Sequence, residues 1–410
     1  MTLAIRVLIG LVAGFLLGLA LAGSSSPAAT TTIDILTPVG TVFVNLIRMT
    51  VIPLLVTLLV ANVGAMTASR GLGRTGVRAL LISVGLLFVA AIGSVFIAVP
   101  ILARLPIDQA AALALRGSVT ASSPGAVVPS DSPTLAQWVV DLVPQNVIKA
   151  AADGAMVPVI LFAVMLGLAL TTVSPEKREG ALRAVEGFAE AMQRLVVWIL
   201  ALAPIGVFAL AVPLAARLGL SAAGAVIAYV ALVVTLTVVA VAVILYPIGI
   251  LAGRMSTSAF VSYCAPAQAI AFAARSSLAA LPAMVESAER AGLPPGASRV
   301  VLPLSLSVFH FGSAIAQAVG VVFLARLFGV TLTPPQLAAV VCAVVLASFA
   351  VPGIPGGSII AMVPVLAAAN LPVDGVAILL AVDTIPDMFR TTANVTGAMT
   401  LTAILPAPTD

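Results

Sequence analysis

Apolar runs long enough to cross a lipid bilayer recur along almost the whole of this sequence. The first of them, residues 3–22, contains a single charged residue, Arg6. About 20 predominantly apolar residues suffice for a helix to span the hydrocarbon core of a membrane. Only 8% of the residues are charged and 61% are hydrophobic, whereas about 25% are charged in a typical soluble domain. We therefore interpret the chain as an all-α, polytopic membrane protein.

The first apolar run precedes a small-residue loop, residues 23–32, as a signal peptide would. Its length favours a first transmembrane helix instead. Further spans are expected at residues 35–65, 79–103, 155–173, 176–214 and 222–252, with a polar connection over 105–150. A cytoplasmic N-terminus would place most basic residues inside, namely Arg6, Arg70, Arg74, Arg78, Lys177, Arg178, Arg183 and Arg254, and leave Arg116, Lys149 and Arg217 outside. The positive-inside rule favours this orientation in the inner (plasma) membrane.

Several classes of protein are disfavoured by composition. The net charge is only +4 and the basic residues are scattered, so nucleic acid is not an expected partner. Cys264 and Cys342 lie in apolar segments, and His310 is the single histidine, so we expect no disulfide framework and no metal site. There is no nucleotide-binding loop, and we expect no cofactor.

Two later hydrophobic segments are interrupted. Arg275-Ser276-Ser277 interrupts residues 255–292, and the run VPGIPGGS, which ends at Ser358, interrupts residues 334–370. Each interrupted segment precedes one apolar helix, at about 297–327 and 375–405. Paired interruptions in corresponding positions indicate a transporter binding site, because irregular backbone at membrane depth is tolerated where it lines a cavity. We interpret both segments as re-entrant hairpins; helices kinked by Pro and Gly are the alternative.

The last helix carries a polar face. Asp387, Arg390, Thr391 and Asn394 follow Asp383 by four, seven, eight and eleven positions, a spacing that places them along one side of an α-helix. Charges at this depth are costly unless they face a cavity, the protein interior or a ligand. We interpret this face as the floor of a binding site. An internal salt bridge and polar helix packing are the alternatives.

The order of these motifs resembles the glutamate transporter family of dicarboxylate and amino-acid:cation symporters. The resemblance rests on Arg275-Ser276-Ser277, Val301-Leu-Pro-Leu304, Pro352-Gly-Ile-Pro-Gly356 and Asp387-Met-Phe-Arg-Thr-Thr-Ala-Asn-Val-Thr-Gly397. It implies an elevator fold with eight transmembrane helices and two re-entrant helical hairpins, assembled as a homotrimer. Residues 1–75 and 105–215 would form a static scaffold, and residues 76–104 and 216–410 a mobile transport domain.

The resemblance also implies roles for single residues. Arg390 corresponds to the arginine that binds the side-chain carboxylate of the substrate, a contact that suits the planar guanidinium. Asp387 corresponds to the aspartate that binds the substrate amino group. The other substrate-binding positions are Thr391, Asn394, Ser313, the first hairpin tip with Ser276 and Ser277, and the second tip with Ile354 and Gly356. Arg275, His310 and Asp383 are supporting or coupling candidates.

The sequence departs from this family at its sodium ligands. In the unwound middle of its seventh helix the family reads Asn-Met-Asp-Gly-Thr, where this chain reads Phe309-His310-Phe311-Gly312-Ser313. A family aspartate in the last helix is replaced by Ala398. Phenylalanine offers no oxygen ligand of the kind hard cations need; a site built from backbone carbonyls stays open. We expect sodium-independent transport, either proton-coupled or uncoupled. His310 is a proton candidate, because imidazole titrates near neutral pH, or a neutral hydrogen-bonding group, and Asp383 is a second candidate.

The function expected from these features is secondary transport of an acidic amino acid, aspartate or glutamate, across the lipid bilayer. A sodium-coupled symporter of acidic amino acids or C4-dicarboxylates is the alternative within the same class. A substrate-independent anion channel is the alternative from another class. An intramembrane enzyme is not expected, because no nucleophile and base have a defensible spacing.

Overall fold

The computed structural model describes residues 3–22, 26–68, 73–105, 140, 143–153, 155–218, 220–294 and 301–405, and every regular element in these ranges is helical. The first helices are α1 (Leu3–Leu21), α2 (Pro27–Ala68), α3 (Gly73–Ala103), α6 (Val147–Ala152), α7 (Met156–Leu170), α8 (Pro175–Ala201), α9 (Ala203–Leu218) and α10 (Leu220–Ala240). A π-helical turn, η1 (Val241–Leu245), joins α10 to α11 (Tyr246–Leu251). The remaining helices are α12 (Thr257–Ala274), α13 (Ser277–Arg290), α14 (Leu302–Val308), α15 (Phe311–Leu327), α16 (Pro334–Ser348), α17 (Gly357–Ile360), α18 (Val363–Ala368), α19 (Gly375–Val382) and α20 (Thr384–Ile404). The expected polar connection over 105–150 lies largely outside the described residues.

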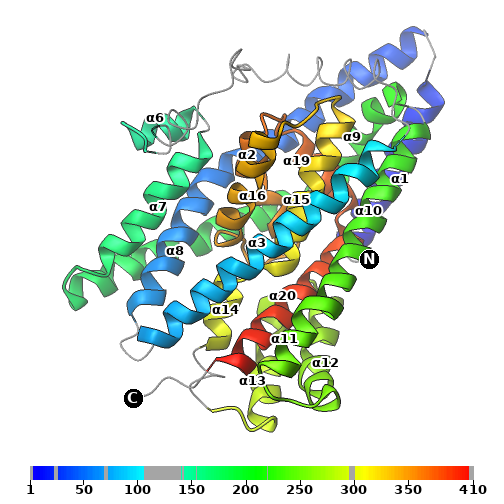
Figure 1. Ribbon diagram of the computed structural model, residues 1–410. Coiled ribbons are helices and arrows are strands. Elements are labelled where there is room, and N and C mark those ends of the chain that lie inside the picture. The colour runs from blue at the N-terminus through cyan, green and yellow to red at the C-terminus, as the bar shows by residue number, and fades with distance from the viewer. Residues whose placement is uncertain are drawn as a thin grey trace.

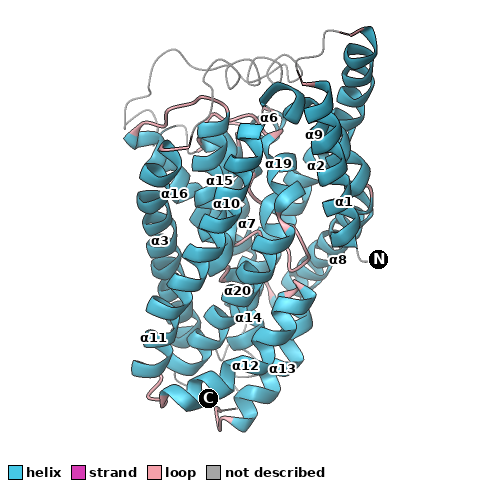
Figure 2. Ribbon diagram, turned by 90° about the vertical axis from the view of Figure 1, so that its right-hand side faces the viewer, coloured by secondary structure: helices cyan, strands magenta, loops and turns pink. Residues whose placement is uncertain are grey.

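The longer helices run roughly alongside one another, and α12 and α13 gather at one end of the molecule (Figures 1 and 2). In the first half of the chain, α1 packs along α9, and α2 packs against α7, α8 and α9. In contrast, α3 packs against α15 and α16, and α10 packs against α15 and α20. The two early helices α3 and α10 therefore associate with the C-terminal half of the chain.

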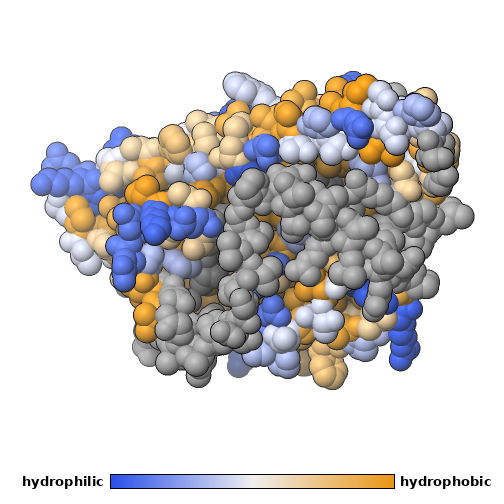
Figure 3. All heavy atoms as spheres, turned by 90° about the horizontal axis from the view of Figure 1, so that it is seen from above, coloured by the Kyte–Doolittle hydropathy of each residue, from blue (hydrophilic) through white to orange (hydrophobic). Residues whose placement is uncertain are grey.

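The outer surface is strongly apolar. Phe96 is 80% exposed and Leu251 is 78% exposed, and hydrophobic residues line one edge of the face seen in Figure 3. Large exposed apolar areas of this kind suit contact with lipid. Three helical stretches in the described part of the chain, Pro27–Gly64, Arg78–Ala103 and Gly224–Leu251, are long and apolar enough to span a membrane, and the bent pair α8 and α9 makes a fourth if it is one span. The expected number of eight spans stays a prediction.

Two helix boundaries differ from those expected. α2 begins at Pro27, inside the expected loop, where the hydroxyls of Thr30, Thr31 and Thr32 donate to carbonyl oxygens three or four residues earlier. The single long helix expected over 176–214 is wrong, because α8 and α9 meet at a bend of 56°. Pro204, in the first turn of α9, lacks the N–H that would continue the hydrogen-bond ladder.

Both interrupted segments fold as a helix, a tip and a returning helix. The first hairpin consists of α12 and α13, and its tip contains Arg275 in the left-handed conformation, with φ 52°. The Ser276 hydroxyl caps α13 by accepting the N–H of Ala279 at 3.3 Å. The second hairpin consists of α16 followed by α17 and α18, and its tip ends at Gly356 with φ +75°, a conformation that favours glycine. The predicted interruptions thus mark the tips.

The helix after each hairpin is itself broken. The first break agrees with the unwound segment that the resemblance implies at 309–313, whereas the apolar run over 375–405 was expected to form one continuous helix. Phe309 and His310 leave helical geometry between α14 and α15, with ψ values of 87° and 66°. The second break lies at Asp383, between α19 and α20. Pro386 has no N–H to donate to the carbonyl of Val382, so the sequence itself weakens the helix at this point.

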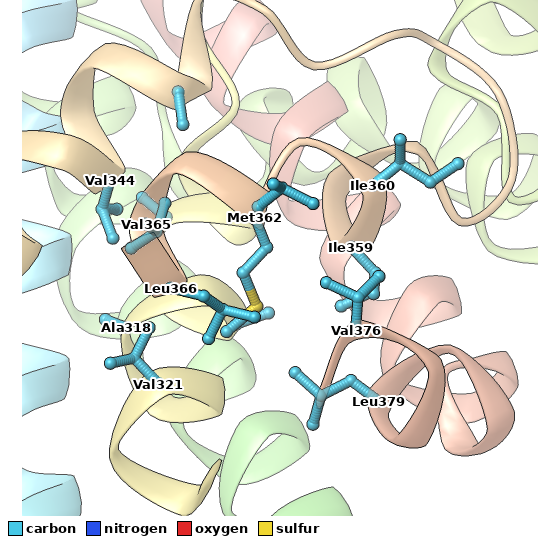
Figure 4. Close-up of a cluster of buried hydrophobic side chains, with 14 of the residues drawn as sticks. Ala318, Val321, Val344, Ile359, Ile360, Met362, Val365, Leu366, Val376 and Leu379 are labelled. Atoms are coloured by element: carbon cyan, nitrogen blue, oxygen red, sulfur yellow. The ribbon is translucent and has the colours of Figure 1, made fainter. Parts of the chain in front are cut away.

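The second hairpin is anchored by a buried apolar cluster. Figure 4 shows Met362 and Leu366 of the hairpin beside Val321 of α15, with Val376 and Leu379 of α19 nearby. Met362 and Leu379 are fully buried. This packing buries the part of the hairpin that lies away from its tip.

Candidate substrate-binding site

The centre of the site is Arg390, whose side chain is fully buried. Its Nη1 and Nη2 atoms donate to the two oxygens of Asp383, each at 2.8 Å. Nη2 also donates to Oδ1 of Asp387 at 2.6 Å. A single guanidinium therefore binds two carboxylates, as a bidentate pair with one and a charge-assisted hydrogen bond with the other. The shared face predicted from the spacing is confirmed for these three residues.

Asp387 connects this face to both hairpin tips. Its Oδ2 accepts the backbone N–H of Gly356 at 3.2 Å and lies 3.9 Å from Nη1 of Arg275. Its Oδ1 also accepts the hydroxyl of Thr391 at 3.4 Å. Hence one carboxylate contacts α20, the first tip and the second tip, so that movement of either tip changes the surroundings of Asp387.

The two tips contact each other directly. The Ser276 hydroxyl donates to the backbone carbonyl of Gly353 at 3.0 Å. Ser277 is buried as the first residue of α13, and Ile354 is half-buried in the second tip. The structure therefore brings together the tip residues that the sequence singled out, in a closed arrangement over Asp387.

Asn394 and Ser313 bind each other and the start of α15. Asn394 Oδ1 accepts the backbone N–H groups of Gly312 at 2.8 Å and Ser313 at 3.2 Å, and its Nδ2 donates to the Ser313 hydroxyl at 3.1 Å. The Ser313 hydroxyl lies 2.6 Å from that of Ser358 in α17. Gln317 donates to the carbonyl of Ser358 at 2.9 Å. In this conformation Asn394 supplies the helix cap at the break, which explains how the α15 N-terminus is satisfied while buried.

Ser358 and Gln317 were missed by the sequence reasoning, although both belong to this buried polar group. Ser358 is the last residue of the VPGIPGGS run, and this position at the end of the break is the signal that could have identified it. Gln317 follows Ser313 by four positions, so it shares the same helix face.

His310 stands apart from the Arg390 cluster. Its Nδ1 lies 2.8 Å from the carbonyl oxygen of Ser348, at the end of α16. Its side chain is buried, and within the described part of the chain Nε2 has no hydrogen-bond partner. The structure therefore places His310 at the junction of α15 with the second hairpin, as a group that bonds to backbone.

The three positions at which the resemblance predicted the loss of sodium ligands hold buried apolar side chains. Phe309, Phe311 and Ala398 are all fully buried, and the two rings lie with centroids 6.0 Å apart. A Cβ atom added to Gly397 would lie 2.6 Å from Cε1 of Phe309. The Phe309 ring thus packs tightly against the helix turn that carries Ala398.

A small cavity borders the cluster. It has a volume of about 50 Å³ and is lined by Leu3, Val7, Leu200, Ala203, Arg275, Pro355, Gly356, Leu380, Asp383 and Thr384. Sites for small molecules usually measure about 300 Å³ or more. The site is therefore closed in this conformation, and a substrate requires the tips to separate.

Two polar contacts join α2 to the C-terminal half of the chain. Arg48 forms a 2.8 Å ion pair with Asp374, next to the start of α19. Asn62 donates to the carbonyl of Phe349 at 3.0 Å, at the end of α16. These partners are about 300 residues apart, with separations of 326 and 287, and no local pattern in the sequence indicated them.

Comparison with known proteins adds an independent observation. The family described as "Sodium:dicarboxylate symporter family" matches residues 3–407. The chain is 28% identical to a proton/glutamate-aspartate symporter of Escherichia coli, over 97% of this chain and 90% of the relative. It is 28% identical to a proton/sodium-glutamate symport protein of Bacillus caldotenax, covering 96% and 91%. It is also 29% identical to an L-cystine uptake protein of Bacillus licheniformis, covering 96% and 86%.

Proposed function

Because the chain belongs to the sodium:dicarboxylate symporter family, a family of multi-pass membrane transporters and not of enzymes, we propose that it carries aspartate or glutamate across the membrane without sodium. The observation that carries this proposal is the buried pair of Arg390 and Asp387 beneath two hairpin tips that touch. A cation and an anion at one closed site suit a ligand that bears both charges.

The chemistry of the pair favours an acidic amino acid. A guanidinium has five N–H donors, and within the described residues Nε of Arg390 has no partner. A substrate carboxylate binds at this Nε edge, where it replaces Asp387 on Nη2. The released Asp387 then accepts the substrate ammonium group. A C4-dicarboxylate has no ammonium group and would leave Asp387 facing a second negative charge, so this pairing disfavours it.

Opening of the second tip admits the substrate. Separation breaks the contacts of Gly353 with Ser276 and of Gly356 with Asp387. Each is a hydrogen bond that contributes about 1 kcal/mol, or up to about 3 kcal/mol where a charge takes part. A gate held by few such bonds opens at low cost, and a bound amino acid that contacts both tips favours its closure.

The proposal includes the architecture expected from the resemblance. Eight transmembrane helices and two re-entrant hairpins form a homotrimer in the plasma membrane, with a cytoplasmic N-terminus. Residues 1–75 and 105–215 form the scaffold, and residues 76–104 and 216–410 move as an elevator. The separate packing of α1, α2, α7, α8 and α9 from that of α3, α10, α15, α16 and α20 supports this division.

Sodium independence rests on Phe309, Phe311 and Ala398. None of the three has a side-chain oxygen, and the Phe309 ring fills the space against Gly397. The relative from Escherichia coli is named for a proton as its coupling ion, which agrees with transport that needs no sodium.

Uptake into proteoliposomes tests the proposal. Purified protein is reconstituted, and radiolabelled aspartate uptake is measured with a sodium gradient, with a proton gradient and with neither. We expect uptake that does not change with sodium, and competition by glutamate that exceeds competition by succinate or cystine. A steep dependence of uptake on sodium concentration would contradict sodium independence. Competition by succinate that exceeds competition by glutamate would contradict an acidic amino acid as the substrate.

A further inference from the structure

The charged groups of the closed site balance one another. Asp383 and Asp387 are opposed by Arg390 and by Arg275, which lies 3.9 Å from Asp387. An acidic amino acid brings two carboxylates and one ammonium group, so its binding adds one net negative charge. Uncompensated charge is costly in a buried site. Because this chain lacks the side-chain ligands for sodium, another cation is needed to offset the negative charge that the substrate adds.

Asp383 is the carboxylate with the least support from other groups. Its hydrogen bonds within the described residues are both to Arg390, and its side chain is almost fully buried. The charged and titratable groups facing it are Arg390 and Asp387 from α20, Arg275 from the first tip and Tyr229 from α10. Asp387, in contrast, also accepts the Gly356 N–H and the Thr391 hydroxyl.

We propose that Asp383 takes up one proton when the amino acid binds, so that substrate and proton cross the membrane together. The inference rests on the proposed function. When the substrate carboxylate shares Arg390, the guanidinium stabilises the Asp383 anion less. A proton from water then adds to one Asp383 oxygen to form the neutral acid. On release the proton returns to water and Asp383 is again a carboxylate anion paired with Arg390.

The other two candidates have less suitable surroundings. Asp387 meets the substrate ammonium group in the bound state, so its negative charge already has a positive partner there. His310 has the Ser348 carbonyl as its partner and lies among buried aromatic rings, next to Phe309 and Phe311. Within the described part of the chain, no carboxylate forms an ion pair with this imidazole. The geometry therefore assigns the proton to the Arg390 cluster.

A route for the proton adjoins Asp383. The cavity of about 50 Å³ is lined by Asp383 and Thr384 together with Arg275. A water molecule needs roughly 10–15 Å³ of such space, so the cavity is large enough for a short chain of water molecules. Its remaining walls include Leu3 and Val7 of α1, so that it opens beside the scaffold.

Calorimetry measures the proton directly. Aspartate is titrated into the purified protein near neutral pH in buffers that differ in ionisation enthalpy, and the dependence of the heat on the buffer gives the protons taken up. We expect one proton per aspartate for the unaltered protein and for His310→Gln, and none for Asp383→Asn. Glu286→Gln is the matched control, because Glu286 is an exposed carboxylate on α13 and should leave the value at one. Retention of the proton in Asp383→Asn, or its loss in His310→Gln, overturns the assignment.

If Asp383→Asn fails to fold or to bind aspartate, infrared difference spectroscopy tests whether Asp383 takes up the proton. Aspartate binding to the unaltered protein should produce the C=O stretching band of a protonated carboxylic acid, and Asp383→Glu should shift that band. A missing band, or a band that Asp383→Glu leaves in place, refutes the inference. Aspartate binding without proton uptake rejects this inference alone, whereas failure of the unaltered protein to bind or transport acidic amino acids rejects the proposed function.

Discussion

Replacement of Arg390 by lysine tests whether the guanidinium geometry, and not only its charge, binds the substrate. Arg390 makes three hydrogen bonds to two carboxylates, at 2.6–2.8 Å, and its Nε has no partner among the residues that the structure describes. Lysine keeps the positive charge but presents it as a compact ammonium group that does not form the planar fork. The Arg390→Lys substitution should therefore leave the charge balance intact and remove the bidentate contact.

The magnitude follows from the number of hydrogen bonds lost. A substrate carboxylate at the Nε edge accepts two N–H groups from arginine and one from lysine. A hydrogen bond to a charged group contributes about 1.5–3 kcal/mol. Since about 1.4 kcal/mol is a factor of ten, we expect aspartate to bind about 10- to 150-fold more weakly to Arg390→Lys.

The assay is equilibrium binding of aspartate to purified protein in detergent, with thermal unfolding recorded to confirm that each variant is folded. Arg326→Lys is the matched control. Arg326 is also a partly buried arginine that donates a hydrogen bond, here to the Leu105 carbonyl at 2.9 Å, but it lies at the far end of α15. Its variant should bind aspartate within about twofold of the unaltered protein, since it keeps every contact at the site. A folded Arg390→Lys variant with nearly unchanged affinity would refute the reasoning.

Two further predictions concern the helices around the site. Arg48→Ala and Asp374→Ala each remove the ion pair between α2 and the start of α19, which contributes about 1 kcal/mol or less. Because this pair links the proposed scaffold to the proposed transport domain, we expect aspartate uptake to accelerate by up to about fivefold with unchanged affinity. Reduced affinity at an unchanged rate would contradict this. Gly14→Leu should lower the temperature of thermal unfolding, because a Cβ there would lie 2.7 Å from the carbonyl oxygen of Phe208 in α9, and overpacking costs about 1–3 kcal/mol. Gly85→Leu is its control, since no atom of the described residues lies within 4 Å of a Cβ at that position. Equal shifts for the two variants would reject close packing of α1 on α9.

The general plan of the fold was predictable from local patterns. Apolar composition identified a helical membrane protein, and the Arg275-Ser276-Ser277 and VPGIPGGS interruptions marked both hairpin tips. Helix boundaries were less predictable, because they depend on capping and on neighbours. The break at Asp383 was missed although Pro386 lies three residues beyond it, and the bend between α8 and α9 was missed although Pro204 marks it.

The candidate site was likewise predictable only in part. Helical periodicity alone placed Asp383, Asp387 and Arg390 on one face, and sequence alone determined that Phe309, Phe311 and Ala398 offer no side-chain ligand to sodium. The periodicity of one helix says which side chains share a face, but it carries no information on what packs against that face. Only the tertiary structure decided that both tips close over Asp387.

The partners of the remaining groups come from distant parts of the chain. Asn394 caps a helix that begins 83 positions earlier, at Phe311, and its bonds to Gly312 and Ser313 span 82 and 81 positions. His310 bonds to Ser348, 38 positions away. Such pairs are set by the packing of whole helices, so residue type and spacing do not specify them. The sequence by itself thus determined which charges the membrane must accommodate, and the tertiary structure decided which of them bind one another.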